Sequence, residues 1–285
     1  MTTQRHPDWL KVRMPGGPTY LELRQLLHSG ELHTVCEEAH CPNIGECWER
    51  HSATFMVLGS VCTRACRYCA VTSGRPAGVD LEEPARLAST AARLGLRYCI
   101  ITSVDRDDLP DGGAFIFSQC IQEVHRLLPS CQVEVLVPDF QGNWPALRGV
   151  LRARPAVLNH NIETVRRVFR SVRAKGDYDL SLELLRRAKE YAPEVPTKSG
   201  LMVGLGETVE ELQETMTDLR AVGCDLLTIG QYLRPSPRHV AMDRYYHPDE
   251  FAQLAEKGYG LGFRHVAAGP LVRSSYHAEE QARAV

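Results

Sequence analysis

The sequence predicts an α/β fold built from parallel strand–helix units. Short, continuously apolar runs alternate with longer segments of helical periodicity, and no repeat or low-complexity segment interrupts them. The 285 residues are 44% hydrophobic and 24% charged, a balance that allows a sizeable core in one large domain with additions. The six units in the sequence are too few for a closed eight-stranded barrel, so the pattern indicates an open, partial barrel or a doubly wound sheet.

Each expected strand is a continuous apolar run, as strands covered on both faces require. The strands span residues 54–59, 98–102, 133–137, 157–160, 198–203 and 225–229. The expected helices lie near residues 83–94, 112–127, 144–153, 161–170 with 178–191, 208–222 and 249–260. Thr208 and Glu211 form a capping-box pattern at the start of one helix. Because parallel strands end at one edge, functional groups should lie just after the strands.

The composition argues against several broad classes of function. The formal net charge is −2, so the chain has no general attraction to nucleic acid. No apolar run approaches the roughly 20 residues that span a bilayer. The first ten residues lack the apolar centre of a signal peptide. We therefore expect a cytoplasmic protein with no membrane or nucleic-acid partner.

Ten cysteines in such a chain need an explanation other than disulfide bonds. Six of them lie within 34 residues and form two triads, Cys36, Cys41 and Cys47, and Cys62, Cys66 and Cys69. The other four are scattered singly through the chain, which favours buried, inert thiols. They are Cys99, Cys120, Cys131 and Cys224.

The second triad indicates an iron–sulfur centre. Its C-x3-C-x2-C spacing, directly after the first expected strand, lets three thiolates wrap around one soft metal centre. A cubane cluster has four irons, so three cysteines leave one iron without a protein ligand. An open metal position is where substrate chemistry occurs.

A structural zinc site is the alternative for the first triad. Structural zinc takes four nitrogen or sulfur ligands, typically spaced as two short pairs. Neither triad shows paired C-x2-C spacing. His33, His40 and His51 are nevertheless near enough in sequence to complete a zinc site there. Spacing alone therefore leaves both metals open for the first triad.

With the aromatic Tyr68 before its last cysteine, the second triad resembles the signature of the radical S-adenosylmethionine (SAM) superfamily. The first triad, C-x4-C-x5-C just upstream, narrows this resemblance to the lipoyl synthase family. Further segments similar to that family's motifs, in the family's order, cover nearly the whole chain. They are CPNIGECW (41–48), CRYCAV (66–71), SVDRDDLPDGGA (103–114), TKSGLMVGLGET (197–208), GQYLRPS (230–236) and RHVAAGPLVRSSYHA (264–278).

The resemblance implies a partial (β/α)6 barrel of the TIM type in residues 51–263. An N-terminal extension, 1–50, is expected to carry auxiliary cluster ligands, and a C-terminal tail, 264–285, to close the active site. The implied cofactors are SAM and two 4Fe–4S clusters. By the same resemblance the second triad holds the cluster that cleaves SAM to a 5′-deoxyadenosyl radical. The first triad holds a sulfur-donating cluster whose fourth ligand is Ser274 or Ser275, and we favour Ser275.

The implied reaction inserts two sulfur atoms, at C6 and C8 of an octanoyl group amide-linked to a lysine of a lipoyl carrier domain. The implied carriers are the glycine cleavage H protein and the 2-oxoacid dehydrogenase E2 subunit. A low-potential reductant such as ferredoxin or flavodoxin is the other implied partner. One alternative is a biotin-synthase-like enzyme, whose auxiliary ligands are dispersed, as Cys99, Cys131 and Cys224 are. The other is a non-catalytic iron–sulfur or zinc protein.

The SAM site is expected at the strand ends. By the resemblance, its candidate residues are Tyr68, Ser103, Asp105, Arg106, Asn159, Asn161, Glu163, Met202, Gly204, Glu207 and Arg234. Glycines near Met202 let the backbone approach a ligand closely, so Met202 is expected to face adenine. Glu207 also fits the first-turn acid of the following helix. Arg173 and Lys198 are further candidates for contacts to a carboxylate.

Overall fold

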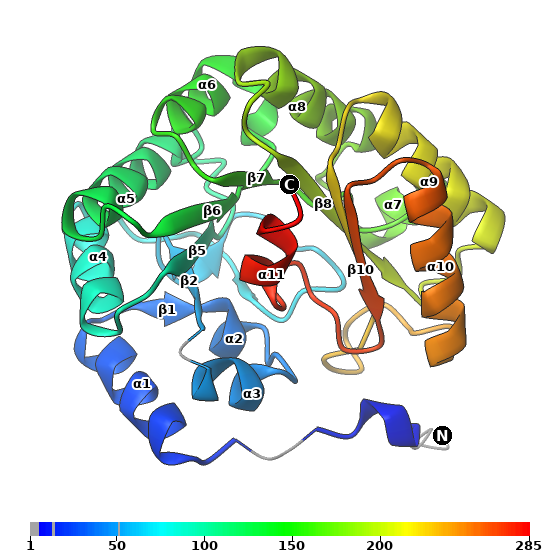
Figure 1. The fold of residues 1–285 in the computed structure, drawn as a ribbon, viewed down its shortest axis with the longest axis horizontal. Helices are drawn as coiled ribbons and strands as arrows, with labels where there is room; N and C mark the ends of the chain where they lie inside the picture. Colours follow the sequence, from blue (N-terminus) through cyan, green and yellow to red (C-terminus); the bar gives the residue numbers. More distant parts are fainter. Residues whose placement is uncertain (1–5, 13–14, 51) are drawn as a thin grey trace.

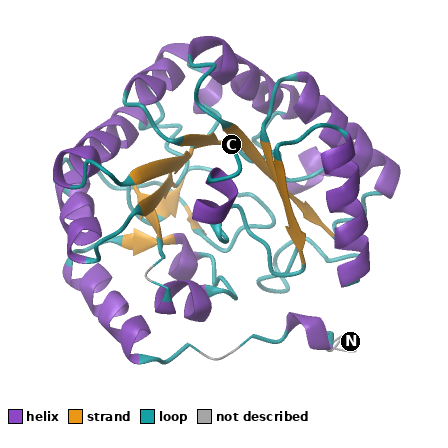
Figure 2. Cartoon of the chain, in the orientation of Figure 1, coloured by secondary structure: helices purple, strands orange, loops and turns teal. Residues whose placement is uncertain are grey.

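The computed structural model describes residues 6–12, 15–50 and 52–285. Their main sheet has eight strands in the order β1-β2-β5-β6-β7-β8-β9-β10. The strands curve into an open barrel with helices α4, α5, α6, α8, α9 and α10 in an arc outside it (Figure 1). Because consecutive strands are neighbours and the helices lie on one side, the structure is a partial barrel and not a doubly wound sheet (Figure 2).

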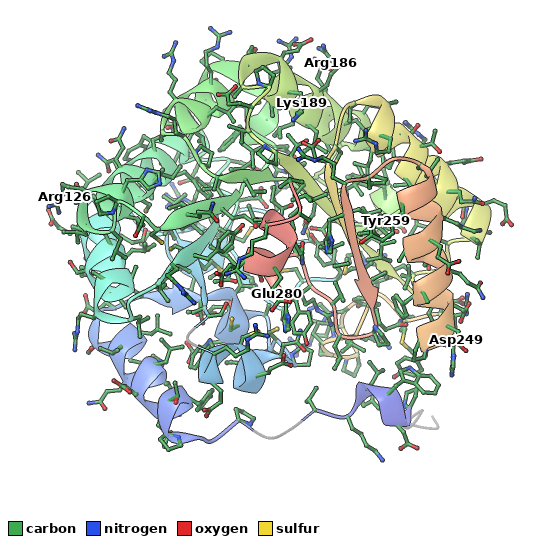
Figure 3. The ribbon with its side chains drawn as sticks, in the orientation of Figure 1. Arg126, Arg186, Lys189, Asp249, Tyr259 and Glu280 are labelled. Carbon is green, nitrogen blue, oxygen red and sulfur yellow. The ribbon has the colours of Figure 1, made fainter. Side chains whose placement is uncertain are left out.

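All six expected strands are present, and each pairs in parallel with the next. They are β2 (Thr54–Val57), β5 (Tyr98–Ser103), β6 (Gln132–Leu136), β7 (Val157–Asn159), β8 (Thr197–Val203) and β9 (Leu226–Gln231). The helices that follow these strands are α4 (Glu83–Arg93), α5 (Ala114–Leu127), α6 (Trp144–Arg152), α7 (Arg166–Val172), α8 (Tyr178–Tyr191), α9 (Val209–Ala221) and α10 (Pro248–Gly260). The capping box of Thr208 and Glu211 is also formed. Charged side chains such as Arg126, Arg186 and Asp249 point outward from this ring (Figure 3).

One helix begins later than expected. The segment 161–170 was expected to be helical throughout, but α7 starts at Arg166. Glu163 has a left-handed backbone (φ 70°), and its N–H donates to the Gly200 carbonyl at 2.9 Å. The Glu163 carbonyl in turn accepts from the N–H of Met202 at 2.8 Å. Over residues 161–165, backbone hydrogen bonds to β8 thus replace those that a helix would form.

The sheet also extends beyond the expected end of the barrel. Residues His265–Gly269 form β10, which pairs in parallel with β9. This segment was expected to be part of the C-terminal tail, and its short, Ala- and Gly-rich sequence has little strand propensity. The boundary at residue 264 therefore marks no break in the sheet. The tail then ends in α11 (Ala278–Ala282), which lies in the middle of the barrel (Figure 1) and packs on Tyr98 and Ile100.

The N-terminal extension packs beside β2 through small elements that the sequence did not predict. These are a 3-10 turn (Asp8–Leu10), α1 (Pro18–Ser29), β1 (His33–Thr34), α2 (Val35–Glu38) and α3 (Ile44–Glu49). Trp48 on α3 is fully buried and stacks on Tyr20 of α1 at 4.9 Å between ring centroids. Thr34 caps α2 by accepting from the Glu37 N–H at 3.3 Å. The two short helices, which carry Cys36 and Cys47 with Cys41 in the turn between them, are therefore fixed to the barrel. No helix in the described ranges is both long and apolar enough to cross a membrane.

A buried polar network joins four consecutive strands inside the barrel. The Lys198 ammonium lies 3.0 Å from Glu134, and both side chains are almost fully buried. Tyr98 donates its hydroxyl hydrogen to the same carboxylate at 2.6 Å, and the Asn159 amide donates to it at 3.2 Å. Tyr98, Asn159 and Lys198 thus all bond to the Glu134 carboxylate, and such additional hydrogen bonds are what makes a buried ion pair tolerable.

Substituting Lys198→Met should destabilise the fold strongly. The change leaves the Glu134 carboxylate buried without its cation, at a cost of about 3–5 kcal/mol in the free energy of unfolding. Urea denaturation of both variants provides the measurement. The control is Arg186→Met, which breaks exposed pairs on α8 and should cost at most about 1 kcal/mol. Equal stability losses in the two variants would contradict the role given to the buried pair.

Candidate active site

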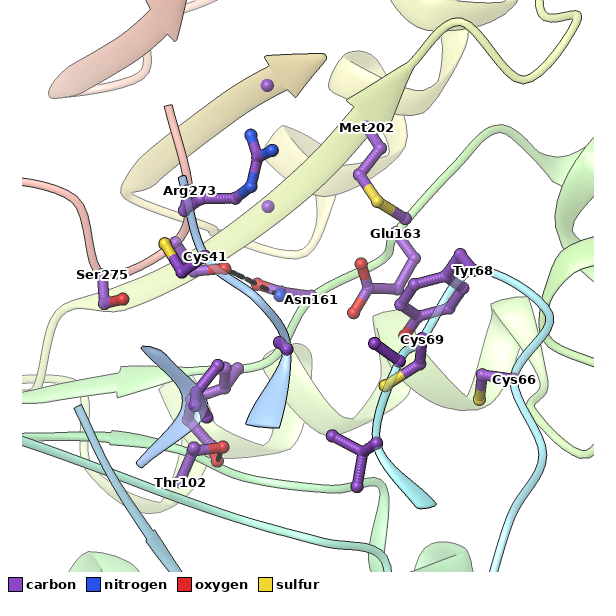
Figure 4. A pocket seen from close by; sticks show the side chains of 18 of the residues that line it. Cys41, Cys66, Tyr68, Cys69, Thr102, Asn161, Glu163, Met202, Arg273 and Ser275 are labelled. Carbon is purple, nitrogen blue, oxygen red and sulfur yellow. Dashed lines mark hydrogen bonds between the residues drawn. The ribbon is translucent and has the colours of Figure 1, made fainter. Parts of the chain in front are cut away.

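Both cysteine triads border a single cavity of about 550 Å³ at the carboxyl ends of the strands. Its lining includes Cys36 and Cys41 of the first triad and all three cysteines of the second. Figure 4 shows Cys41 and Ser275 on one side and Cys66, Tyr68 and Cys69 on the other. A small pocket of about 20 Å³ lies between the first triad and the C-terminal tail, which contributes Ser275 to its wall. Residues that are far apart in the sequence thus meet at one mouth.

The second triad lies on a loop whose ends are joined by a small parallel ladder, β3 (Val61–Cys62) with β4 (Thr72–Ser73). The Cys62 sulfur accepts backbone N–H groups from Arg64 at 3.4 Å and from Asp105 at 3.3 Å. Burial raises the pKa of Cys66 to about 12 and that of Cys69 to about 11. The thiolate form therefore needs a nearby positive charge, which the irons of a cluster supply. Three thiols at one cavity wall fit such a cluster.

Arg64, inside the C-x3-C segment, fixes this loop to the barrel. Its guanidinium donates to the Asp139 carboxylate in two bonds of 2.6 Å and to Asp107 at 2.8–3.1 Å. Asp107 follows β5 and Asp139 follows β6, so one cation ties three strand–helix loops together. Burial alone would raise the pKa of Asp139, but the bonds from Arg64 lower it to about 2. The sequence gives one signal of this clamp, an arginine between two cysteines of the triad, from which we did not predict it.

The first triad has the same electrostatic character. Burial raises the pKa of Cys36 to about 11 and that of Cys47 to about 12. The two serines of the tail differ in position. Ser274 exchanges hydrogen bonds with the Asn161 side chain at 2.8 and 3.1 Å. Ser275 instead borders the small pocket together with the three cysteines. One hydroxyl oxygen thus borders the same pocket as the three thiol sulfurs.

Seven of the expected SAM-site residues line the cavity. They are Tyr68, Ser103, Asp105, Asn161, Glu163, Met202 and Arg234. Arg173 lines it as well, with a nearly buried guanidinium whose Nε has no hydrogen-bond partner within the described chain. Burial raises the pKa values of the Asp105 and Glu163 carboxyls. A buried guanidinium and two buried carboxyls suit the carboxylate and amino groups of an amino-acid ligand.

Four expected residues lie outside the cavity wall, each for a local reason. Arg106 forms a bidentate pair with Asp108 at 2.7–2.8 Å, and Asn159 belongs to the buried network of Glu134. The Glu207 carboxylate accepts the N–H groups of Gly204 and Leu205 at 2.6 and 2.8 Å. Gly204 and Glu207 thereby close the turn after β8. Lys198, a further candidate for contacts to a carboxylate, forms its ion pair with Glu134 instead.

Close packing around the cavity explains why residue 200 is a glycine. A Cβ on Gly200 would lie 2.7 Å from Thr228 Oγ1 and 2.8 Å from Asn161 Oδ1. Only glycine leaves Asn161 room to hold Ser274. Beside it, the left-handed Glu163 is a strained position that bonding to β8 maintains.

The four remaining cysteines lie apart from both triads. Cys99, Cys120, Cys131 and Cys224 are buried and absent from the cavity wall. The dispersed ligands of a biotin-synthase-like site are therefore not supported. His33 bonds Glu38 at 3.1 Å, His40 lines the cavity, and His51 lies outside the described residues. Among the described residues, no three His, Cys, Asp or Glu side chains converge on a single-ion site.

Comparisons with known family models and with curated proteins agree on one family. A model described as "Radical SAM superfamily" matches residues 56–219, and one described as "N-terminal domain of lipoyl synthase of Radical_SAM family" matches residues 1–41. The lipoyl synthase of Symbiobacterium thermophilum is 58% identical over 277 residues, which cover 97% of this chain and 87% of the relative. That of Bacillus subtilis is 54% identical over 278 residues, covering 97% and 93%.

Solved structures show a similar fold at low sequence identity. Methylornithine synthase matches with a TM-score of 0.56 and 14% identity, over 71% of this chain and 61% of that chain. Streptococcus suis SuiB bound to S-adenosylmethionine matches with a TM-score of 0.56 and 10% identity, over 75% and 49%. This chain thus spans about half to three-fifths of those proteins, and the likeness concerns the fold alone.

Substituting Arg64→Lys should impair metal binding at the second triad. Lysine keeps the charge but lacks the planar fork that bridges two carboxylates, so the loop loses its clamp. In a chain whose first triad is replaced by alanine, we expect severalfold less iron after anaerobic reconstitution. Iron and sulfide analysis is the measurement, and Arg75→Lys, an exposed position near the same loop, is the control. Full iron content in Arg64→Lys would show that metal binding at the second triad does not need this clamp.

Proposed function

Because the chain belongs to the lipoyl synthase family of the radical SAM superfamily, we propose that it inserts two sulfur atoms into an octanoyl group. The proposed positions are C6 and C8 of an octanoyl chain that is amide-linked to a lysine of a carrier protein. The observation that carries this proposal is the pair of cysteine triads at one cavity. A site that only transfers electrons needs no second triad facing the first.

The family's cofactors, SAM and two 4Fe–4S clusters, fit the residues present. Cys62, Cys66 and Cys69 provide three thiolates and leave a fourth iron free for SAM. When bound, this cluster and SAM supply a radical that removes hydrogen from an unactivated carbon. Cys36, Cys41 and Cys47 provide the ligands of the cluster that donates sulfur. The division of labour between the triads is part of the proposal.

The protein's own residues position the reactants and keep water out. Arg173 is suited to hold the SAM carboxylate, and Asp105 and Glu163 are suited to hold its amino group. Apolar side chains from the extension and the barrel, among them Val35 and Met56, line the same cavity. They provide an environment for an octanoyl chain and exclude competing hydrogen donors.

We assign Ser275 as the fourth ligand of the first triad's cluster. Its place at the small pocket supports this assignment, whereas Ser274 is bound to Asn161. An alkoxide oxygen is a harder ligand than thiolate and suits iron–sulfur less well. A weaker ligand allows one iron to open when the cluster must release sulfide.

The substrate class is an octanoylated carrier protein. The specific carriers in this proposal are the glycine cleavage H protein and 2-oxoacid dehydrogenase E2 subunits. Ferredoxin or flavodoxin is the proposed electron donor. The cytoplasm is the proposed location, since thiols of this kind require a reducing compartment.

Substitutions in the two triads should separate two activities. Cys66→Ser should abolish SAM cleavage, because the cluster that reduces SAM loses a ligand. Cys41→Ala should preserve 5′-deoxyadenosine formation but yield no lipoyl product, because the sulfur store is lost. Chromatography of both products after anaerobic turnover provides the measurement. Cys120→Ala, at a buried cysteine away from the cavity, should retain both activities. Lipoyl product from the Cys41 variant would refute the sulfur-donor assignment.

Substitutions at the two tail serines should differ in their effect on iron. Ser275→Ala removes a ligand oxygen, so the first triad should retain iron poorly after reconstitution and desalting. Ser274→Ala loses only the bonds to Asn161, worth about 1 kcal/mol, and should retain iron normally. Iron analysis in a chain that lacks the second triad's cysteines gives the comparison. Equal retention in the two variants would exclude Ser275 as a ligand.

A further inference from the structure

Four exposed cationic side chains belong to three segments that hydrogen bonds join at the loop of the second cysteine triad. They are Arg67, Arg170, Lys175 and Arg238, which we call the cluster-loop basic face. They lie in segments 60–79, 164–176 and 226–242, which contain no acidic residue although the chain's net charge is −2. None of the four forms an ion pair within the described chain. Their charges are therefore available to a partner.

Hydrogen bonds hold the three segments together. The Arg67 guanidinium donates to the Ser171 carbonyl at 3.2 Å, and its backbone N–H donates to the Val172 carbonyl at 2.8 Å. The Lys175 ammonium donates to the Thr63 carbonyl at 3.1 Å. These bonds place the ends of α7 and of the cysteine loop side by side.

The third segment joins on the other side of Arg67. The Val240 N–H donates to the Arg67 carbonyl at 2.8 Å. His239 Nε2 lies 3.0 Å from the carbonyl oxygen of Cys69. The stretch that carries Arg238 is thus bonded directly to the segment that contains two cysteines of the triad.

This face is separate from the cavity. None of its four residues belongs to the cavity wall. Three other cations of these segments, Arg64, Arg173 and Arg234, line the cavity instead, and Arg234 is bonded to the carbonyls of Pro237 and His239. The basic face therefore suits a partner that stays outside the active site. Arg67 stands between Cys66 and Cys69 in the sequence, so such a partner comes close to the metal-binding loop without entering.

We propose that the cluster-loop basic face docks an acidic, low-potential electron-carrier protein, a flavoprotein or a small iron–sulfur protein. The inference rests on the proposed function, which requires one electron for each SAM cleaved. One electron passes from the reduced carrier to the cluster at Cys62, Cys66 and Cys69, so the carrier is oxidised and the cluster reduced. Electron tunnelling falls steeply with distance, and this face includes Arg67, which stands between Cys66 and Cys69 in the sequence. Opposite charges also raise the rate of association.

The octanoylated carrier protein is the competing occupant. It has to place a lysine-linked chain in the cavity and therefore sits over the mouth, which the four cations do not border. Position thus favours the electron carrier for this face.

The test is the rate of cluster reduction in the reconstituted holoenzyme, followed by absorbance before any product forms. With reduced flavodoxin, Arg67→Glu/Lys175→Glu should be slowed at least about tenfold at low salt, and the difference should shrink as ionic strength rises. With reduced methyl viologen, a small cation, the same variant should not be slowed. Arg97→Glu, exposed at the opposite end of the barrel, is the control for a charge reversal away from this face and should behave as the unsubstituted chain does.

Two outcomes would overturn the proposal. The first is a rate of cluster reduction by flavodoxin that the substitutions leave unchanged, or that falls equally with flavodoxin and with methyl viologen. This result would have to hold in the double variant and in the milder variants Arg67→Gln and Lys175→Gln. The second is normal reduction by flavodoxin with weaker binding of the octanoylated carrier, which would give this face to the carrier protein. Failure of the proposed function would look different, as normal cluster reduction in the unsubstituted chain without any lipoyl product.

Discussion

The open edge of the barrel is the constraint on which the rest of the structure depends. The sheet ends at β1 and β10, which do not pair with each other in the described chain. The N-terminal extension and the C-terminal tail fill that gap and bind each other. Asn43 donates to the Leu271 carbonyl at 2.7 Å, and Tyr276 donates to Glu46 at 3.1 Å. A closed barrel would leave no place for a second metal-binding triad beside the first.

The charge balance of the site follows from this closure. Burial between the extension, the barrel and the tail raises the pKa values of the thiols in both triads, which favours the neutral form in the absence of metal. Bound iron reverses that balance, so occupation of the site and ionisation of the cysteines go together. The positive charge of Arg64 is neutralised separately, by the carboxylates of Asp107 and Asp139. It can therefore hold the loop without competing for the thiolates.

Much of this arrangement could be predicted from the sequence, because it depends on patterns within short segments. Continuous apolar runs identified the six strands, and spacing identified both triads. Properties set by contacts between distant segments could not be read in the same way. β10 is short and rich in small residues, and it forms because β9 offers a free edge. Glu163 leaves the expected helix because β8 binds its backbone.

The SAM-site residues show the same limit. Position after a strand placed Asp105, Asn161 and Glu163 at the cavity. The same rule did not show that Arg106 and Glu207 bind groups of their own loops. Only the folded arrangement distinguishes a side chain that faces the cavity from one that closes a turn.

The central claim is that one cavity joins a reusable radical-generating triad to a sulfur store. Isotope transfer in a single turnover tests it most directly. The chain is reconstituted with iron and 34S-sulfide, freed of excess sulfide, and allowed to react with an octanoylated carrier protein in unlabelled buffer. We expect both sulfur atoms of the lipoyl product to carry the label, with no more than one product formed per chain. Unlabelled product, or repeated turnover without loss of iron from the first triad, would contradict it.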